Sequence, residues 1–167
     1  FMRHMFDFPI HAADDFQITG KLQPEGSNSH IVFAKLKVQP NNSFVFKALR
    51  NDDNGDLDYT VFVEIITHYR ILKSYGAQAN LSTLFNFFAS RNHAWLIMPL
   101  YKYSFDMFFS SADRVTASNI KRAFRQLCLA LQKLHDIGIA HRDLKTHNIM
   151  FDALWEIVVI DFGLCSI

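Results

Sequence analysis

The order of strand-like and helix-like segments changes near Pro99, and this change constrains the fold more than any other feature of the sequence. Before it, residues 16–22, 30–38 and 43–49 are short segments rich in β-branched and aromatic side chains, separated by turn-rich stretches. They predict an antiparallel meander of three strands. After Pro99 the apolar residues recur mainly at helical spacing. We therefore predict an α+β fold with a strand-rich first half and a helix-rich second half.

One helix and two further strands complete the predicted first half. Residues 58–73 place apolar side chains at helical spacing, and Asp58 is a suitable N-cap. Residues 81–90 and 94–100 have the composition of two strands joined by a short connection. The first half is thus expected to hold a five-stranded antiparallel sheet and one helix.

The clearest helix of the second half covers residues 118–136. Ser118 can cap its start, and Gly138 can supply the left-handed residue past its end. A short helix is expected within 104–112, and "IMFD" with "IVVID" predicts a short hairpin near the end. The apolar side chains that mark the long helix, spaced by four and three residues, are Ile120, Phe124, Leu127, Leu131 and Leu134.

Composition excludes several classes of protein. Of the 167 residues, 50% are hydrophobic and 20% are charged, with a net charge of +1. No run of Lys and Arg predicts nucleic-acid binding, and no apolar run approaches the roughly 20 residues of a membrane span. Cys128 and Cys165 have no metal-binding spacing, and no signal peptide is expected. We expect a reducing intracellular compartment, cytoplasmic or nuclear.

Chemistry-bearing side chains gather in "HRDLKTHN" at 141–148 and in "DFG" at 161–163. The hairpin between these motifs would return Asp161 to the neighbourhood of Asn148. Amide and carboxylate oxygens suit Mg²⁺, and the Asp143 carboxylate can orient or deprotonate a hydroxyl. Taken singly, each residue is explained as well by a capping or turn role. Capping and turn roles do not explain why all of these residues occur together at this spacing.

Together, H-R-D-L-K-x-x-N and D-F-G resemble the catalytic loop and the magnesium-binding motif of the eukaryotic protein kinase family. The resemblance implies ATP and Mg²⁺ as cofactors and a protein as substrate. It implies that Asp143 is the catalytic base and that Asn148 and Asp161 hold Mg²⁺. Lys145 matches the serine/threonine branch and could contact the γ-phosphate as a point charge.

Two upstream residues extend the resemblance. Lys47 ends "FVFK" and stands where the family places its strand lysine, and Glu64 is the only Glu of the following helix. Both are assigned to the catalytic set. A carboxylate beside a buried apolar stripe needs a partner, and Lys47 is the natural one. A solvated strand lysine and an exposed helical Glu are the alternatives.

The glycine-rich loop departs from the family pattern G-x-G-x-x-G-x-V. This chain has "PEGSNSHI", so Pro24 and Ser29 replace the outer glycines, Gly26 alone remains, and Ile31 stands for the Val. Glycines let backbone amides approach phosphates, whereas Pro fixes φ and lacks an N–H. We expect a stiffer loop and a weaker affinity for nucleotide.

The remaining correspondences concern packing, and for each a plain core role is the alternative. The resemblance places Met98 at the gatekeeper position and 99–101, with Leu100, at the hinge whose backbone meets adenine. The residues expected to enclose the adenine ring are Ile31, Val45 and Met150. The residues expected to stack as a column linking the lobes are Leu84, His68, Phe162 and His141, of which His68 is an unusual, polar member.

The resemblance covers the chain from about Phe16 to Ile167 and implies a two-lobed fold with an incomplete helical C-lobe. Residues 1–98 would form the N-lobe, with an extension to about 15, and residues 99–167 the hinge and the first part of the C-lobe. Three explanations stay open: an excerpt, a dimer or partner chain that completes the C-lobe, or a shortened relative. In each case the apolar stripe of 118–136 is expected to be partly exposed.

These features favour an ATP- and Mg²⁺-dependent protein serine/threonine kinase, with no nucleic acid and no membrane as partner. The eroded glycine loop motivates an alternative, a catalytically impaired or truncated kinase-like binding or regulatory module. Small-molecule kinases of the aminoglycoside or choline type share H-x-D-x-x-x-x-N and a downstream Asp. The H-R-D-L-K and D-F-G details argue against that third class.

Overall fold

The computed structural model describes residues 13–22, 30–51, 54, 58–77, 80–89, 93–110, 113 and 115–167. The chain forms two compact units. Unit 1 comprises Phe1–Ile65 and Thr83–Leu100, and unit 2 comprises Ile66–Ser82 and Tyr101–Ile167. The lobe limits proposed from the sequence, 1–98 and 99–167, stay a prediction.

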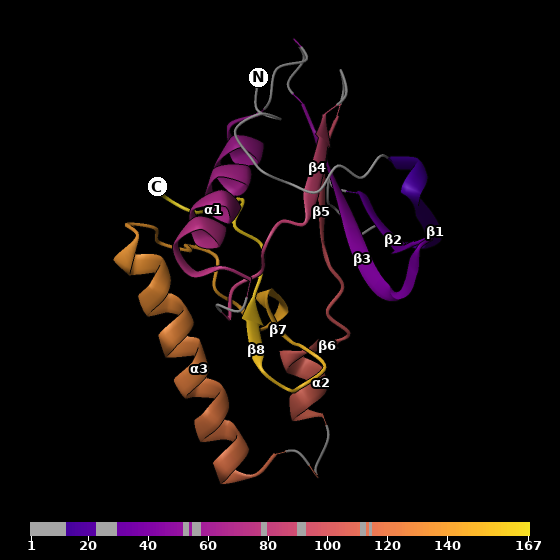
Figure 1. The fold of residues 1–167 in the computed structure, drawn as a ribbon. Helices are drawn as coiled ribbons and strands as arrows, with labels where there is room; N and C mark the ends of the chain where they lie inside the picture. Colours follow the sequence, from indigo (N-terminus) through magenta and orange to yellow (C-terminus); the bar gives the residue numbers. More distant parts are fainter. Residues whose placement is uncertain are drawn as a thin grey trace. The chain divides into compact units, whose positions relative to one another are not determined.

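Unit 1 is built on a five-stranded antiparallel sheet with the strand order β1-β2-β3-β5-β4 (Figure 1). The predicted sheet and the predicted meander of its first three strands are confirmed. A single turn of 3-10 helix, η2 (Ala13–Asp15), precedes the sheet. The strands are β1 (Phe16–Leu22), β2 (His30–Leu36), β3 (Gln39–Arg50), β4 (Asn86–Ala89) and β5 (His93–Pro99).

Aromatic side chains fill the core on one part of this sheet. The rings of Phe16 and Phe44 meet edge to face at 5.7 Å, and Phe44 also lies 4.6 Å from Phe85. Edge-to-face and tilted pairs of this kind stabilise a core beyond the apolar area that they bury. Ala34, Leu36 and Ile97 complete the buried cluster.

Helix α1 (Tyr59–Tyr75) follows β3 and contributes residues to both units. Asp58 caps it, because its Oδ1 accepts the backbone N–H of Thr60 at 2.8 Å, as the sequence predicted. In unit 2, the Arg70 guanidinium of α1 donates to the carbonyl of Ile137, and Tyr75 Oη donates to the carbonyl of Lys133 at 2.9 Å. Both acceptors lie at the end of the long helix α3, so side chains of α1 satisfy carbonyls that a helix end leaves free.

Unit 2 contains α2 (Phe105–Phe109), α3 (Ala117–Asp136) and a small sheet of order β6-β7-β8. Its strands are β6 (Tyr103–Ser104), β7 (Ile149–Phe151) and β8 (Ile157–Val159), and the 3-10 turn η3 (Thr146–Asn148) leads into β7. The predicted short helix and terminal hairpin are therefore present. Neither these helices nor α1 is long and apolar enough to cross a membrane.

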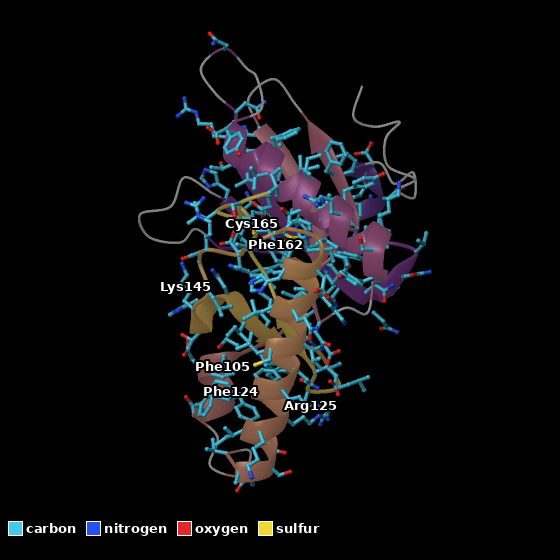
Figure 2. All side chains as sticks on the ribbon, turned by 90° about the vertical axis from the view of Figure 1, so that its left-hand side faces the viewer. Phe105, Phe124, Arg125, Lys145, Phe162 and Cys165 are labelled. Carbon is cyan, nitrogen blue, oxygen red and sulfur yellow. The ribbon has the colours of Figure 1, made fainter. Side chains whose placement is uncertain are left out.

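The start of α3 differs from the prediction, whereas its apolar stripe is partly exposed, as expected. The N-cap is Thr116, whose Oγ1 accepts the N–H of Asn119 at 3.2 Å, and not Ser118, which already lies inside the helix. The buried face is formed by Ala123, Leu127, Ala130 and Leu134. Two of these four side chains are therefore the small methyl groups of Ala123 and Ala130. Phe124 is 51% exposed, and its ring meets that of Phe105, beside which it lies in Figure 2, edge to face at 6.3 Å.

The chain that follows α1 is fastened to β8. Leu81 forms an isolated parallel bridge with Val159, which donates its N–H to Asn80 O at 3.0 Å and accepts from Ser82 N at 2.8 Å. Asn80 Nδ2 also donates to Ile157 O at 2.9 Å. These bonds hold residues 80–82 beside the strand that leads to Asp161.

Candidate active site

The loop between α3 and β7 brings Asp143, Lys145 and Asn148 together. Lys145 Nζ donates to Asp143 Oδ2 at 2.8 Å. Asn148 Nδ2 donates to the same Oδ2 at 2.9 Å and to the Asp143 carbonyl at 2.8 Å. The amide nitrogen of the buried Asn148 is therefore directed at Asp143, and its Oδ1 is left as a hard oxygen donor.

Local backbone geometry produces this arrangement. Arg142 has a φ of 64°, in the left-handed region that non-glycine residues enter rarely. The turn η3 then reverses the chain, with Asn148 N donating to Lys145 O at 2.9 Å. The Asn148 side chain consequently returns to the Asp143 backbone. Strained residues of this kind persist where the surrounding structure fixes them, which is common at functional sites.

The charges of the loop keep Asp143 ionised. The hydrogen bond from Lys145 is the main cause that lowers the pKa of Asp143, and the bond from Asn148 lowers it further. Burial and the negative charge of Asp161 both act to raise the pKa of Asp143. In return, the hydrogen bond to Asp143 raises the pKa of Lys145. Near neutral pH the pair is a carboxylate and an ammonium.

His141 connects this loop to the chain before Asp161. Its Nε2 lies 3.1 Å from the carbonyl of Ile160, and its Nδ1 accepts the N–H of Asp143 at 3.3 Å. Ile160 N also donates to Asn148 O at 3.0 Å. The predicted neighbourhood of Asn148 and Asp161 is therefore built by one backbone hydrogen bond and two contacts of the His141 ring. The sequence placed His141 only in a packing column, and its bonding role was missed.

Phe162 lies between two imidazole rings. Its centroid is 5.0 Å from that of His68 and 5.6 Å from that of His141, and all three side chains are buried. His68 Nδ1 lies 3.1 Å from Ser82 O, so the polar member of the column donates to a backbone carbonyl. Three members of the predicted column are thus in contact within unit 2. The fourth, Leu84, is a buried residue of unit 1.

In unit 1, Lys47 pairs with Glu64. Lys47 Nζ lies 2.9 Å from Oε1 and 3.0 Å from Oε2 of Glu64. The side chains are 15% and 1% exposed. The ion pair expected from the sequence is present, because a carboxylate placed among the buried residues of α1 needs a cation nearby. The catalytic roles of the two residues stay a prediction.

The residues expected around adenine occupy register positions on the central strands. Ile31 lies opposite Lys47 in the β2–β3 pair, and Val45 lies opposite the buried Met98 in the β3–β5 pair. Leu100 N donates to Ser43 O at 2.9 Å, so this N–H already has an acceptor within unit 1.

Met150 and Gly26 are the two remaining assignments. Met150 belongs to β7 of unit 2, opposite Val158. Gly26 and its neighbours Pro24 and Ser29 lie outside the residues that the structure describes.

The donor set fits a hard divalent cation that also binds phosphate. Asn148 offers an amide oxygen and Asp161 a carboxylate, and Asp161 has a φ of 65°. Within the described ranges no group of three or more His, Cys, Asp or Glu side chains could enclose a metal. Mg²⁺ commonly takes only one or two protein oxygens, and phosphates and waters complete its shell. The pair therefore suits a metal that arrives with a phosphorylated ligand.

Comparison with known proteins gives the same family as the motifs. A family model described as "Protein kinase domain" matches residues 24–167. The muscle M-line assembly protein unc-89 of Caenorhabditis elegans is 29% identical over 160 residues, covering 91% of this chain and 2% of that protein. The probable serine/threonine-protein kinase KCC4 of Saccharomyces cerevisiae is 26% identical, covering 91% of this chain and 14% of the kinase.

A plant relative is similar over nearly as much of the chain. The CBL-interacting serine/threonine-protein kinase 1 of Arabidopsis thaliana is 29% identical over 150 residues, covering 89% of this chain. The chain spans 2%, 14% and 33% of the lengths of these three relatives. The resemblance predicted from the motifs is confirmed: because the matching model extends over residues 24–167, the chain belongs to the protein kinase domain family.

Proposed function

We propose that this protein transfers the γ-phosphate of ATP to a serine or threonine hydroxyl of a protein substrate, with Mg²⁺ as the metal. The observation that carries the proposal is the Asp143 carboxylate, held by Lys145 at 2.8 Å and by Asn148 at 2.9 Å. A general base must be ionised and fixed in place, and these two donors supply both conditions.

Each residue of the catalytic loop has a role that its contacts support. Asp143 accepts or orients the proton of the substrate hydroxyl, and Lys145 is placed beside it to contact the transferred phosphate. Asn148 Oδ1 and the Asp161 carboxylate would hold Mg²⁺, which neutralises phosphate charge when it is bound. His141 holds the two parts of this set at a fixed spacing through Ile160 O and Asp143 N.

The nucleotide contacts are proposed from the positions in unit 1 and on β7. Lys47, oriented by Glu64, would contact the phosphates of ATP, as the strand lysine of the family does. Apolar side chains would contact the adenine ring, and Gly26 would lie at the phosphates. The residues that would enclose the ring are Ile31, Val45 and Met150, with Met98 as the gatekeeper and Leu100 in the hinge whose backbone meets adenine.

Radiolabel transfer from ATP to a mixed serine/threonine peptide library tests the activity. We expect Asp143→Asn and Asp161→Asn in the full-length protein to abolish transfer. Asp106→Asn, which changes an exposed carboxylate of α2, is the control and should leave transfer intact. Transfer that persists undiminished in either site variant contradicts the assignment.

A second candidate, a kinase-like binding module without catalysis, is favoured by Pro24 and Ser29 in the glycine-rich loop. Thermal unfolding with Mg-ATP separates the two. A ligand that binds the native state raises the melting temperature as its concentration rises. A rise together with transfer supports the kinase. No rise up to millimolar Mg-ATP, with no transfer, supports the binding module.

A further inference from the structure

A cavity of about 230 Å³ opens on unit 2, lined by residues of α2, α3, β7 and the turn between β7 and β8. An apolar cavity of roughly 150 Å³ is known to take up benzene, so this one has room for a single aromatic or branched aliphatic side chain. None of its lining residues belongs to the candidate active site. The cavity therefore needs an explanation of its own.

Its inner lining is aromatic and already ordered. The buried rings of Phe108 and Phe151 stack at 4.9 Å with an interplanar angle of 20°. Trp155 lies 5.8 Å from Phe151 and stacks on Tyr103 at 4.5 Å. Ala123 contributes only a methyl group to the lining, which leaves the space open. Rigid aromatic walls bind an apolar group without the cost of ordering side chains first.

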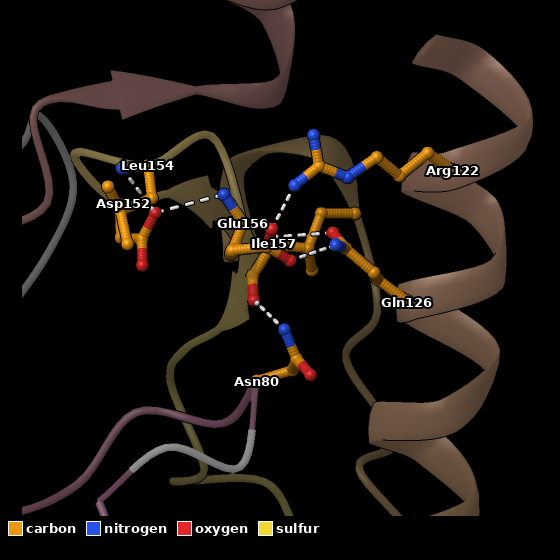
Figure 3. Close-up of polar contacts among 7 residues, drawn as sticks. All are labelled: Asn80, Arg122, Gln126, Asp152, Leu154, Glu156 and Ile157. Carbon is orange, nitrogen blue, oxygen red and sulfur yellow. Dashed lines mark hydrogen bonds and ion pairs between the residues drawn. The ribbon is translucent and has the colours of Figure 1, made fainter. Parts of the chain in front are cut away.

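The outer lining is held by a polar network. Asp152 Oδ1 accepts the N–H groups of Leu154 at 2.8 Å and Glu156 at 2.9 Å. The Glu156 carboxylate binds Arg122 and Gln126 of α3, and Gln126 Oε1 accepts from Ile157 N at 3.0 Å, as Figure 3 shows. The turn is thereby fixed to α3. It presents Leu154, which is 76% exposed, at the edge of the cavity.

The charged group of the lining is a cation. Arg122 is 54% exposed, and Nη2 of its guanidinium, which has five N–H donors, contacts Glu156. Residues 119–126 carry three cations, Lys121, Arg122 and Arg125, and no acid. Among the described residues that line the cavity, Arg122 alone is charged, and Asp152 and Glu156 are the two acids of the adjoining turn. An occupant with carboxylates matches this surface, because Arg binds carboxylates through charge-assisted bonds.

We propose that this cavity is a docking site for a segment of a partner protein in which an aromatic or branched aliphatic side chain is flanked by acidic residues. The apolar side chain would enter between Phe108 and Trp155, and a neighbouring carboxylate would bind Arg122. An extended segment also covers Leu154, which a single small molecule inside the cavity leaves exposed. The site acts by binding and does not depend on phosphoryl transfer.

An array of immobilised nonapeptides without Ser, Thr or Tyr tests the proposal, because such peptides cannot accept phosphate. The central residue is Phe, Leu, Trp or Ala, and the flanks are acidic, neutral or basic. We expect the fluorescently labelled full-length protein to be retained most by acidic peptides with an apolar centre. The strongest of these is then measured in solution by fluorescence anisotropy.

Variants locate the binding. Arg122→Gln should weaken binding of the acidic peptide about tenfold, the worth of one charge-assisted bond, and should leave the neutral peptide unchanged. Leu154→Ala removes only an exposed side chain and should weaken both peptides. Arg125→Gln, which changes a cation of the same helix that does not line the cavity, is the matched control and should have the smaller effect. Ala123→Leu should fill the cavity, with melting temperature as the check on folding.

Several results would overturn the proposal. Retention that is equal for Ala and Phe centres, or stronger for basic flanks, contradicts the occupant. Equal affinity in the Arg122→Gln, Leu154→Ala and wild-type proteins contradicts the location. Saturation by free indole with no peptide retained indicates a small-molecule cavity instead. Self-association that Leu154→Ala abolishes, without peptide binding, indicates that a second copy is the occupant.

Discussion

Lys47 Nζ lies 2.9 Å from Oε1 and 3.0 Å from Oε2 of Glu64, so one ammonium contacts both oxygens of a carboxylate that is only 1% exposed. β3 and α1 supply the two residues, and their contact fixes the helix to the sheet within unit 1. A buried charge that loses its partner is costly, whereas a partly exposed one can turn to water. Removing Lys47, which strands the buried Glu64, should therefore cost more stability than removing Glu64.

We expect Lys47→Met to lower the free energy of unfolding by about 2 kcal/mol and Glu64→Gln to lower it by less. The reason is that Lys47, at 15% exposed, retains access to solvent, while the Glu64 carboxylate does not. Urea denaturation at neutral pH measures both. The double variant should cost less than the sum of the two, since the residues interact directly. Lys35→Met, on the exposed part of β2, is the control, and equal losses in all three single variants would contradict the prediction.

Gly138 ends α3 in the left-handed region, with a φ of 71°. Gly138 N donates to His135 O and Ile139 N to Leu134 O, each at 2.9 Å, which is the Schellman pattern of a helix end. A methyl group at this position would meet nothing closer than Arg70 Nη2 at 3.9 Å. Gly138→Ala should therefore destabilise the protein by about 1 kcal/mol through backbone conformation rather than crowding.

Thermal unfolding of the wild-type, Gly138→Ala and Gly138→Asn proteins tests whether backbone conformation causes this loss of stability. Gly138→Asn should lose less than Gly138→Ala, because Asn tolerates the left-handed region better. An equal loss of stability in both variants would show that the loss does not arise from the left-handed backbone conformation at residue 138.

His141 should carry its proton on Nε2 when the ring is neutral. A carbonyl oxygen can only accept, so Ile160 O at 3.1 Å requires Nε2–H. Nδ1 must then be the acceptor for the N–H of Asp143. The ¹⁵N chemical shifts of the His141 ring distinguish the two neutral forms. A ring protonated on Nδ1 would break both contacts and contradict the proposed link between the catalytic loop and Asp161.

The sequence predicts the parts of this fold that depend on local pattern. The β-branched and aromatic composition of β1 to β3 and the helical spacing of apolar residues in α3 are such patterns, and these elements form as expected. The cap of α3 was wrong because Thr116 and Ser118 are equally good capping residues. Which one lies outside the helix depends on where the preceding chain enters. The buried face of α3 also includes Ala123 and Ala130, to which the periodicity of large side chains gives no weight.

The candidate active site also has contacts that local sequence predicts and contacts that it does not. The spacing of Asp143 and Asn148 in one loop is local, and the motif predicts their proximity. The bond from His141 to Ile160 joins residues 19 positions apart and depends on a ring tautomer, so no local pattern encodes it. The cavity beside Trp155 is still less visible, because its lining comes from four separate elements. Tertiary packing alone assembles it.

Lys145 should control the ionisation of Asp143. Its hydrogen bond is the largest cause that lowers the pKa of Asp143, and the bond from Asn148 remains when Lys145 is replaced. Lys145→Met should therefore raise the pKa of Asp143 part of the way to its ordinary value. ¹³C NMR of the aspartate carboxyl groups measures this titration, with Lys102→Met as a control of equal charge change. An unchanged Asp143 titration in Lys145→Met would contradict the prediction.

The pairing of Lys145 with Asp143 also makes the stability of the protein depend on pH. A carboxylate with a folded-state pKa below its unfolded value binds fewer protons in the native state. Its contribution to stability is therefore present above the unfolded pKa and is lost as the pH falls through the folded pKa of Asp143. The wild-type protein should melt above Lys145→Met at neutral pH, and the difference should close in acid. A difference in melting temperature that persists below the folded pKa would show that Lys145 stabilises the loop by packing and not through the charge of Asp143.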